Sequence, residues 1–229
     1  MEIDIDFALG NAVFNYDKKE IRGDAMAMSE AKKYIQELRK KQKNPYLWPD
    51  YLTGLPDKAA IIKKMDEVVP KLGDYSVVYV RIENIQPYLI KYGPDRHAEI
   101  IQWAAAILKT SFDRGSDSFV GTLSTHDFIA VCQTKEMDKL FEEARDIFRK
   151  KVSTYYSKED LRNEVTLSFD RNDGKKINFG LMKFIAVVAD KKLRVKKGEL
   201  IRNMARICDA MEATENEVVV LTDDMLQRE

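Results

Sequence analysis

The chain has 229 residues, of which 45% are hydrophobic, and it carries 38 Lys and Arg against 38 Asp and Glu, with only 10 Gly and 6 Pro. This composition can bury a sizeable core and excludes a disordered, collagen-like or low-complexity protein. The balanced charge provides no field to attract nucleic acid or an anionic membrane, so we expect neither as a partner. No run approaches the roughly 18–20 apolar residues that cross a bilayer, and residues 1–6 are acidic where a signal peptide is basic. We therefore expect a cytoplasmic protein.

The N-terminal region is predicted to consist of two segments. Residues 1–24 alternate weakly between apolar and polar side chains and end at a break around Gly23, which indicates an extended arm. Residues 25–46 are predicted as a linker or signalling helix, because strong helix formers carry apolar residues at steps of three and four. These apolar residues, Met28, Ala31, Ile35 and Leu38, form only a short stripe. Two interpretations therefore remain: the helix lies on its own domain, or it forms a parallel coiled-coil dimer.

Residues 47–229 are predicted as a single domain in which helices and strands alternate. Helical spacing covers residues 58–69, 84–110 with a break at Gly93, 135–155 and 199–213. Strand-like runs cover residues 75–82, 119–123, 128–132, 165–170, 177–188 and 218–221, and polar turns join two pairs of them as hairpins. The sequence therefore predicts an α+β fold with a mixed, largely antiparallel central sheet covered by helices and preceded by the N-terminal helix. Cys132 and Cys208 lie in apolar stretches and are expected to be reduced core thiols.

The start of this domain carries a specific motif. Residues 50–58 read D-Y-L-T-G-L-P-D-K, which resembles the opening D-x-L-T-G-L-x-N-R of the GGDEF domain family. That family comprises the bacterial diguanylate cyclases, which condense two GTP into cyclic di-GMP. The resemblance covers about residues 50–222 and implies a GGDEF-like fold. The motif itself is structural, because it places a turn and a helix start, and it leaves the chemistry open.

The resemblance implies a reaction that needs metal-binding carboxylates, because two divalent ions hold the phosphates of the nucleotide. The family's string D-I-D-x-F-K-x-x-N-D-x-Y-G lies without gaps on residues 81–93. Arg81 stands at the first metal carboxylate, where a cation repels Mg²⁺. Leu89 and Ala98 stand at the positions that would bind guanine.

The signature hairpin of the family is altered as well. Residues 119–128 lie over F-V-A-R-x-G-G-D-E-F. Ser124 and Thr125 replace the two glycines that let the backbone approach the nucleotide, and His126 replaces a metal-binding acid. Asp127 alone keeps its charge.

A third string, residues 203–216, places Met211 and Glu215 at the positions where the family binds the triphosphate with Lys and Arg.

Because three separate strings have changed together, we expect no enzyme, no catalytic residue, no metal site and no cofactor. The sequence predicts a catalytically inactive GGDEF-like domain, a signalling or scaffold module in a cyclic di-GMP type bacterial pathway. It would contact a protein partner or a second copy through the N-terminal helix. An active diguanylate cyclase is the least favoured alternative.

A second alternative is a cyclic di-GMP receptor. Arg114 and Asp117 resemble the R-x-x-D inhibitory motif of the family, in a register that fits if the loop absorbs one extra residue. Arginine can stack on guanine and donate two parallel hydrogen bonds to a phosphate, and an aspartate can accept hydrogen bonds from the edge of guanine. Arg145 is predicted as a second cation of this ligand site. An ordinary surface pair at a helix end is the competing interpretation of Arg114 and Asp117.

Overall fold

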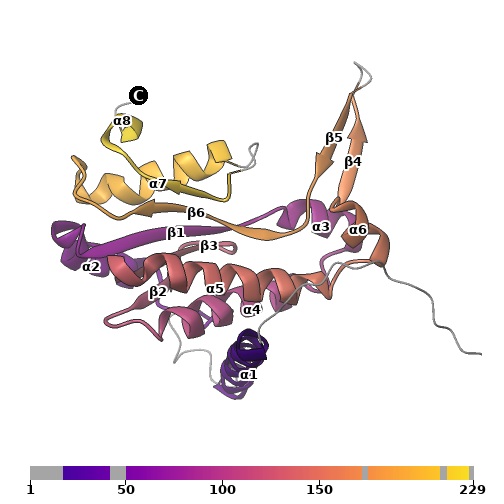
Figure 1. The fold of residues 1–229 in the computed structure, drawn as a ribbon. Helices are drawn as coiled ribbons and strands as arrows, with labels where there is room; N and C mark the ends of the chain where they lie inside the picture. Colours follow the sequence, from indigo (N-terminus) through magenta and orange to yellow (C-terminus); the bar gives the residue numbers. More distant parts are fainter. Residues whose placement is uncertain (1–17, 42–49, 172–174, 212–215, 227–229) are drawn as a thin grey trace, which may run out of the picture.

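A computed structural model describes residues 18–41, 50–171, 175–211 and 216–226 (Figure 1). Helix α1 (Lys18–Lys41) begins at Lys18 rather than at residue 25 and runs through Gly23. The remainder of the expected arm, residues 1–17, lies outside the described residues. A glycine inside a helix costs only about 1 kcal/mol relative to alanine, which a helix of this length tolerates.

The centre of the fold is a sheet with the strand order β2-β3-β1-β6-β7. The central strand β1 runs antiparallel to both β3 and β6, whereas the edge strand β7 runs parallel to β6. The prediction of a mixed, largely antiparallel sheet is therefore confirmed. The strands are β1 (Tyr75–Glu83), β2 (Phe119–Thr122), β3 (Asp127–Gln133), β6 (Lys183–Ala189) and β7 (Val218–Val220).

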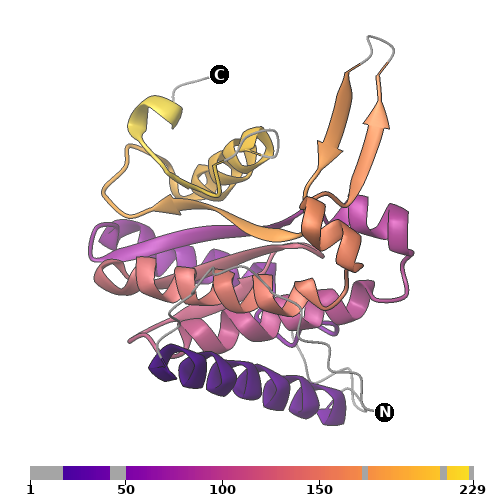
Figure 2. The ribbon, with the colours of Figure 1, turned by 45° about the vertical axis from the view of Figure 1, so that its right-hand side comes forward.

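Helices cover both faces of this sheet (Figures 1 and 2). One face carries α4 (His97–Phe112) and α5 (Thr134–Ser153), and α1 packs on α4 from outside. The other face carries α2 (Lys58–Val68), which continues into a 3-10 turn (Val69–Lys71), and α7 (Lys197–Met211). Shorter helices are α3 (Ile85–Tyr92), α6 (Lys158–Asn163) and the last helix α8 (Asp223–Leu226). None of the helices described is both long and apolar enough to cross a membrane.

The core is divided in two by the sheet. Along β1, Val78, Val80 and Ile82 pack in the α4 and α5 layer, whereas Val77 and Tyr79 pack in the α2 and α7 layer, as the alternation of a strand requires. Both predicted core thiols are confirmed, since Cys132 and Cys208 are buried and neither forms a disulfide within the described part of the chain. Burial, followed by the nearby charges of Glu136 and Asp138, raises the pKa of Cys132 to about 12.

The motif at residues 50–58 folds as its sequence indicates. Asp50 Oδ1 accepts hydrogen bonds from the Thr53 backbone N–H at 2.7 Å and from the Thr53 hydroxyl at 2.6 Å. Asp57 then caps α2 by accepting from the Ala60 backbone N–H at 3.0 Å. A backbone hydrogen bond of 2.9 Å from Thr122 to Pro56 attaches β2 to this turn. Gly121 permits that approach, because a Cβ there would lie 2.6 Å from Ile61 and 3.0 Å from the Pro56 carbonyl oxygen.

A separate two-stranded ribbon projects from the body of the molecule (Figures 1 and 2). It consists of β4 (Leu167–Asp170) and β5 (Lys176–Phe179), and it corrects the prediction of one strand over residues 177–188, which β5 and β6 divide between them. Cross-strand pairing places the apolar side chains on one face, where Phe169 is 48% and Ile177 41% exposed. The four members of that face are Leu167, Phe169, Ile177 and Phe179.

Candidate functional site

The centre of the candidate site is the guanidinium of Arg81, near the end of β1. Arg81 and Asp127 are cross-strand partners in the β1–β3 pair, so their side chains project on the same face of the sheet. Arg81 Nε donates to Asp127 Oδ1 at 2.6 Å, and a second guanidinium nitrogen donates to Asp209 Oδ1 of α7 at 2.5 Å. A third nitrogen donates to the Tyr79 hydroxyl at 3.3 Å.

This arrangement holds the positive charge of Arg81 in place. Only 8% of Arg81 and 8% of Asp127 are exposed. Burial opposes the charged form of Arg81, but the hydrogen bonds to Asp127 and Asp209 outweigh it and raise its pKa. Burial and the charge of Asp127 raise the pKa of Tyr79, so its hydroxyl stays protonated at neutral pH. Arg81 therefore acts as a fixed internal cation between two carboxylates.

The hairpin tip is confirmed at the predicted place, between the end of β2 at Thr122 and the start of β3 at Asp127. The Ser124 hydroxyl donates to Asp127 Oδ2 at 2.7 Å, so the second carboxylate oxygen of Asp127 is also engaged. The His126 carbonyl oxygen accepts from the Ile82 backbone N–H at 3.0 Å, which fixes the hairpin against β1. Both oxygens of the one retained acid thus have partners within the protein.

The other positions taken from the resemblance hold apolar residues, apart from one that lies outside the described residues. Leu89 is partly buried against the α4 and α5 layer of the core, and Ala98 is exposed at the start of α4. Met211 is 4% exposed and packs in the α2 and α7 layer. Glu215 lies outside the described residues. Among the residues that the structure describes, no three His, Cys, Asp or Glu side chains gather as a metal site.

No described contact joins the three residues predicted to bind cyclic di-GMP. Arg114 pairs with Glu30 of α1 at 2.7 Å and with Glu143 of α5. Burial opposes its charge, but the two glutamates outweigh burial and raise the pKa of Arg114. Asp117 instead accepts from the Tyr75 hydroxyl at 3.2 Å. The guanidinium of Arg114 is thus occupied by neighbouring helices.

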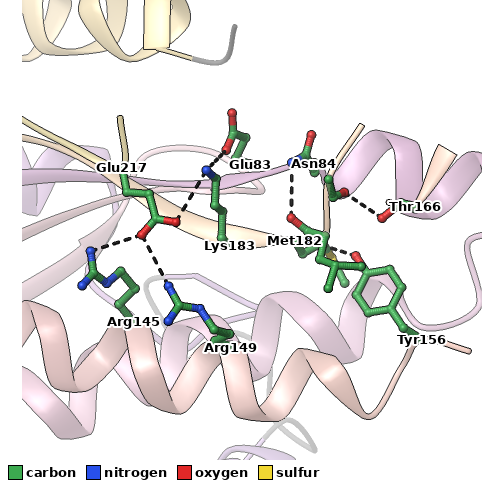
Figure 3. A network of polar contacts seen from close by, with 11 residues as sticks. Glu83, Asn84, Arg145, Arg149, Tyr156, Thr166, Met182, Lys183 and Glu217 are labelled. Carbon is green, nitrogen blue, oxygen red and sulfur yellow. Dashed lines mark hydrogen bonds and ion pairs between the residues drawn. The ribbon is translucent and has the colours of Figure 1, made fainter. Parts of the chain in front are cut away.

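Arg145 belongs to an ionic network at the junction of α5, β6 and β7, which Figure 3 shows. Glu217 accepts from Arg145 at 3.2 Å and from Arg149 at 3.4 Å. Lys183 lies 3.6 Å from Glu217 and 3.3 Å from the buried carboxylate of Glu83. The network connects α5 to β1, to β6 and to the residue before β7, which gives Arg145 a structural contact that its sequence position did not indicate.

Further polar contacts hold the segment between the ribbon and β6 (Figure 3). The Asn84 amide donates to the Leu181 carbonyl oxygen at 3.2 Å, and the Met182 backbone N–H donates to the Tyr156 hydroxyl at 2.8 Å. The Thr166 hydroxyl donates to the Gly180 carbonyl oxygen at 2.7 Å. These bonds turn the chain after β5 and explain why residues 177–188 do not form one continuous strand.

We expect Arg114 to contribute to the docking of α1. Replacement of Arg114 by alanine removes the ion pairs to Glu30 and Glu143, so the free energy that opposes local opening of α1 should fall by about 1 kcal/mol. Hydrogen exchange of the α1 amides measures this change. Lys109→Ala is the matched control, because Lys109 pairs with Asp113 at 2.5 Å and no described ion pair joins it to α1. Equal exchange of α1 in both variants would contradict the prediction.

No family model matches the chain, and no curated protein matches it. Solved structures do match. The diguanylate cyclase SiaD of Pseudomonas aeruginosa, solved in complex with its activator SiaC, has a TM-score of 0.53 at 13% identity, with 89% of this chain and 72% of that chain covered.

Two further structures give similar values. A diguanylate cyclase/phosphodiesterase of Caldicellulosiruptor saccharolyticus has a TM-score of 0.51 at 18% identity and covers 76% of this chain and 92% of its own. The coiled coil and GGDEF domain of DgcB from Caulobacter crescentus, in complex with c-di-GMP, has a TM-score of 0.51 at 11% identity, over 86% and 98%. At these identities the likeness concerns architecture, and the chain has the fold of a GGDEF domain.

Proposed function

We propose that the chain is a catalytically inactive GGDEF-like domain that acts as a signalling or scaffold module in a cyclic di-GMP type pathway. The observation that carries the proposal is the position of Arg81. Its guanidinium lies 2.6 Å from Asp127, the one acid that the altered hairpin retains, and it stands where the family has its first metal carboxylate. A cation at that distance repels Mg²⁺, and both oxygens of Asp127 already accept hydrogen bonds.

The phosphate side of the site supports the same proposal. Met211, which takes the place of a phosphate-binding lysine, is buried among apolar side chains and offers no charge to a triphosphate. On the guanine side, Leu89 packs against the core and cannot donate a side-chain hydrogen bond. Metal, phosphate and base recognition are therefore weakened together, so no single substitution restores the reaction.

The remaining role of such a domain is contact with other proteins, and α1 is the element that we propose for it. Ala27, Ala31 and Ile35 pack against the domain, which leaves the opposite side of α1 outward, where Met26 is 61% exposed. SiaD was solved with an activator protein, and the structure of DgcB contains a coiled coil together with its GGDEF domain. A partner or a second copy would engage the outward side of α1.

We expect no cyclic di-GMP from GTP with Mg²⁺ or Mn²⁺, and we expect none from the double variant Arg81→Asp with His126→Glu. Two restored carboxylates leave Met211 and Leu89 in place, and neither of these apolar side chains can bind phosphate or guanine. Chromatographic detection of the product, with an active diguanylate cyclase assayed in parallel, measures this. Cyclic di-GMP formed by the wild-type chain would refute the proposal.

Calorimetry separates the alternatives. An inactive scaffold gives no heat with GTP and Mg²⁺ and none with cyclic di-GMP. Heat with cyclic di-GMP that disappears in Arg114→Ala would support the receptor alternative instead.

A further inference from the structure

A groove separates α2 from α7 on the side of the sheet that also carries Arg81. Its cavity has a volume of about 590 Å³, and its floor is formed by Tyr79 and the β2–β3 hairpin. The walls are largely apolar, with Ile62 and Met65 on α2 and Ile201 and Ala205 on α7. Ile62 is 54% exposed, so a large apolar side chain faces a space that nothing in the described structure fills.

Two cations line the same groove. Lys58, at the start of α2, and Arg202, in the first half of α7, both contribute to the lining. No ion pair or hydrogen bond of either side chain is found among the residues that the structure describes. Two acids also line the groove, but Asp127 is neutralised by Arg81, and Asp66 has contacts of its own. The groove thus offers apolar walls and two positive charges available to a ligand.

From these features we propose that the groove binds a small amphipathic anion, with an apolar aromatic or acyl body and one carboxylate, sulfonate or phosphate. The apolar body would lie against Ile62, Met65 and Ala205, and the anion would pair with Lys58 and Arg202. The volume is within the range of about 300–1,000 Å³ that is typical of small-molecule sites. This ligand differs from a nucleotide because the two acids that line the groove, Asp66 and Asp127, already have contacts within the protein, and the site goes beyond the proposed scaffold role.

The hydroxyl groups on the floor are consistent with this ligand class. The Tyr79 hydroxyl accepts from Arg81, and the Ser124 hydroxyl donates to Asp127, so the protein already uses both for its own ion pair. An apolar ligand body can pack against these hydroxyl groups without breaking their hydrogen bonds, whereas a strongly polar body would have to compete with these bonds. Asp127 lines the groove and pairs with Arg81, so a bound ligand would lie beside this ion pair.

The test uses 8-anilinonaphthalene-1-sulfonate as the probe, since it combines an aromatic body with one anionic group. Fluorescence titration of the full chain should give one saturable site with a micromolar dissociation constant. The double variant Lys58→Glu with Arg202→Glu should weaken binding at least tenfold, and Ala205→Phe should weaken it similarly by filling the cavity. Ile62→Glu places a carboxylate in the groove at an exposed position, so it tests the site even where Ala205→Phe fails to fold.

The matched control is Lys63→Glu, a charge reversal at an exposed position of α2 that does not line the groove. It should leave the dissociation constant within twofold of the wild-type value. The neutral dye N-phenyl-1-naphthylamine should bind at least tenfold more weakly than the sulfonate. Equal binding in wild type, Ile62→Glu and the double variant, or a weak signal without saturation, would overturn the proposal. These readouts are independent of cyclase activity, so the failure of one proposal leaves the other intact.

Discussion

Replacement of Arg81 by methionine is expected to lower the free energy of unfolding by about 3–5 kcal/mol, because the change leaves the carboxylate of Asp127 buried without its cation. Asp127 is 8% exposed, and the Ser124 hydroxyl alone cannot balance a full charge. Urea unfolding at neutral pH, followed by circular dichroism, measures the loss. Methionine keeps the apolar length of the side chain, so the effect reports the charge rather than a cavity.

Two further variants show how much the Arg81–Asp127 and Arg81–Asp209 ion pairs each contribute to the free energy of unfolding. Asp209→Ala should cost no more than about 1 kcal/mol, because the Asp209 side chain is 67% exposed and water can solvate its charge. Arg81→Met combined with Asp127→Leu should recover most of the stability, since an apolar pair replaces a buried ion pair at little net cost. A loss below about 1 kcal/mol for Arg81→Met alone would mean that Asp127 is compensated by another group.

Phe184→Ala is expected to lower the free energy of unfolding by about 3–5 kcal/mol, because it opens a cavity between β6 and α5. Phe184 and Phe148 are both fully buried, and their rings stack with centroids 3.9 Å apart. The matched control is Phe169→Ala on the ribbon, where the side chain is 48% exposed and the loss should stay within about 1 kcal/mol. Comparable losses at the two positions would mean that the ribbon is covered in solution.

A cycle with Phe148→Ala tests the stacking itself. The double variant should lose less than the sum of the two single losses, because both rings border the same cavity. Additive losses would contradict the arrangement of the two rings.

Much of the fold could be predicted because the central strands are continuous apolar runs. The run at residues 75–82 becomes β1, and its burial on both faces needs only a sheet with helices on either side. The division between β5 and β6 was not predicted, because Gly180, the residue that follows β5, is only a weak break inside a largely apolar run. What ends β5 is a set of tertiary hydrogen bonds from Asn84, Tyr156 and Thr166, and side chains so distant in sequence leave no local signal.

The candidate site could be predicted in part. Arg81 and the hairpin tip follow from ungapped strings, and cross-strand pairing then brings Arg81 next to Asp127. The contribution of Tyr79 could have been inferred, since it lies two residues before Arg81 on the same side of β1. Asp209 could not, because its contact depends on how α7 lies over the sheet. Arg114 was predicted as a ligand residue from a short motif, and such a motif does not reveal that Glu30 of α1 and Glu143 of α5 lie beside it.

Unlike a bound metal ion, the guanidinium of Arg81 is covalently attached to the chain and cannot dissociate. A divalent ion occupies its site according to its concentration in solution, whereas a cation on a side chain has an effective concentration set by the backbone alone. The Asp127 and Asp209 carboxylates are therefore neutralised as soon as β1, β3 and α7 have assembled. Chelators and fluctuations of cellular magnesium leave this pairing unchanged, and the charge balance of the domain becomes a property of its folding rather than of its surroundings.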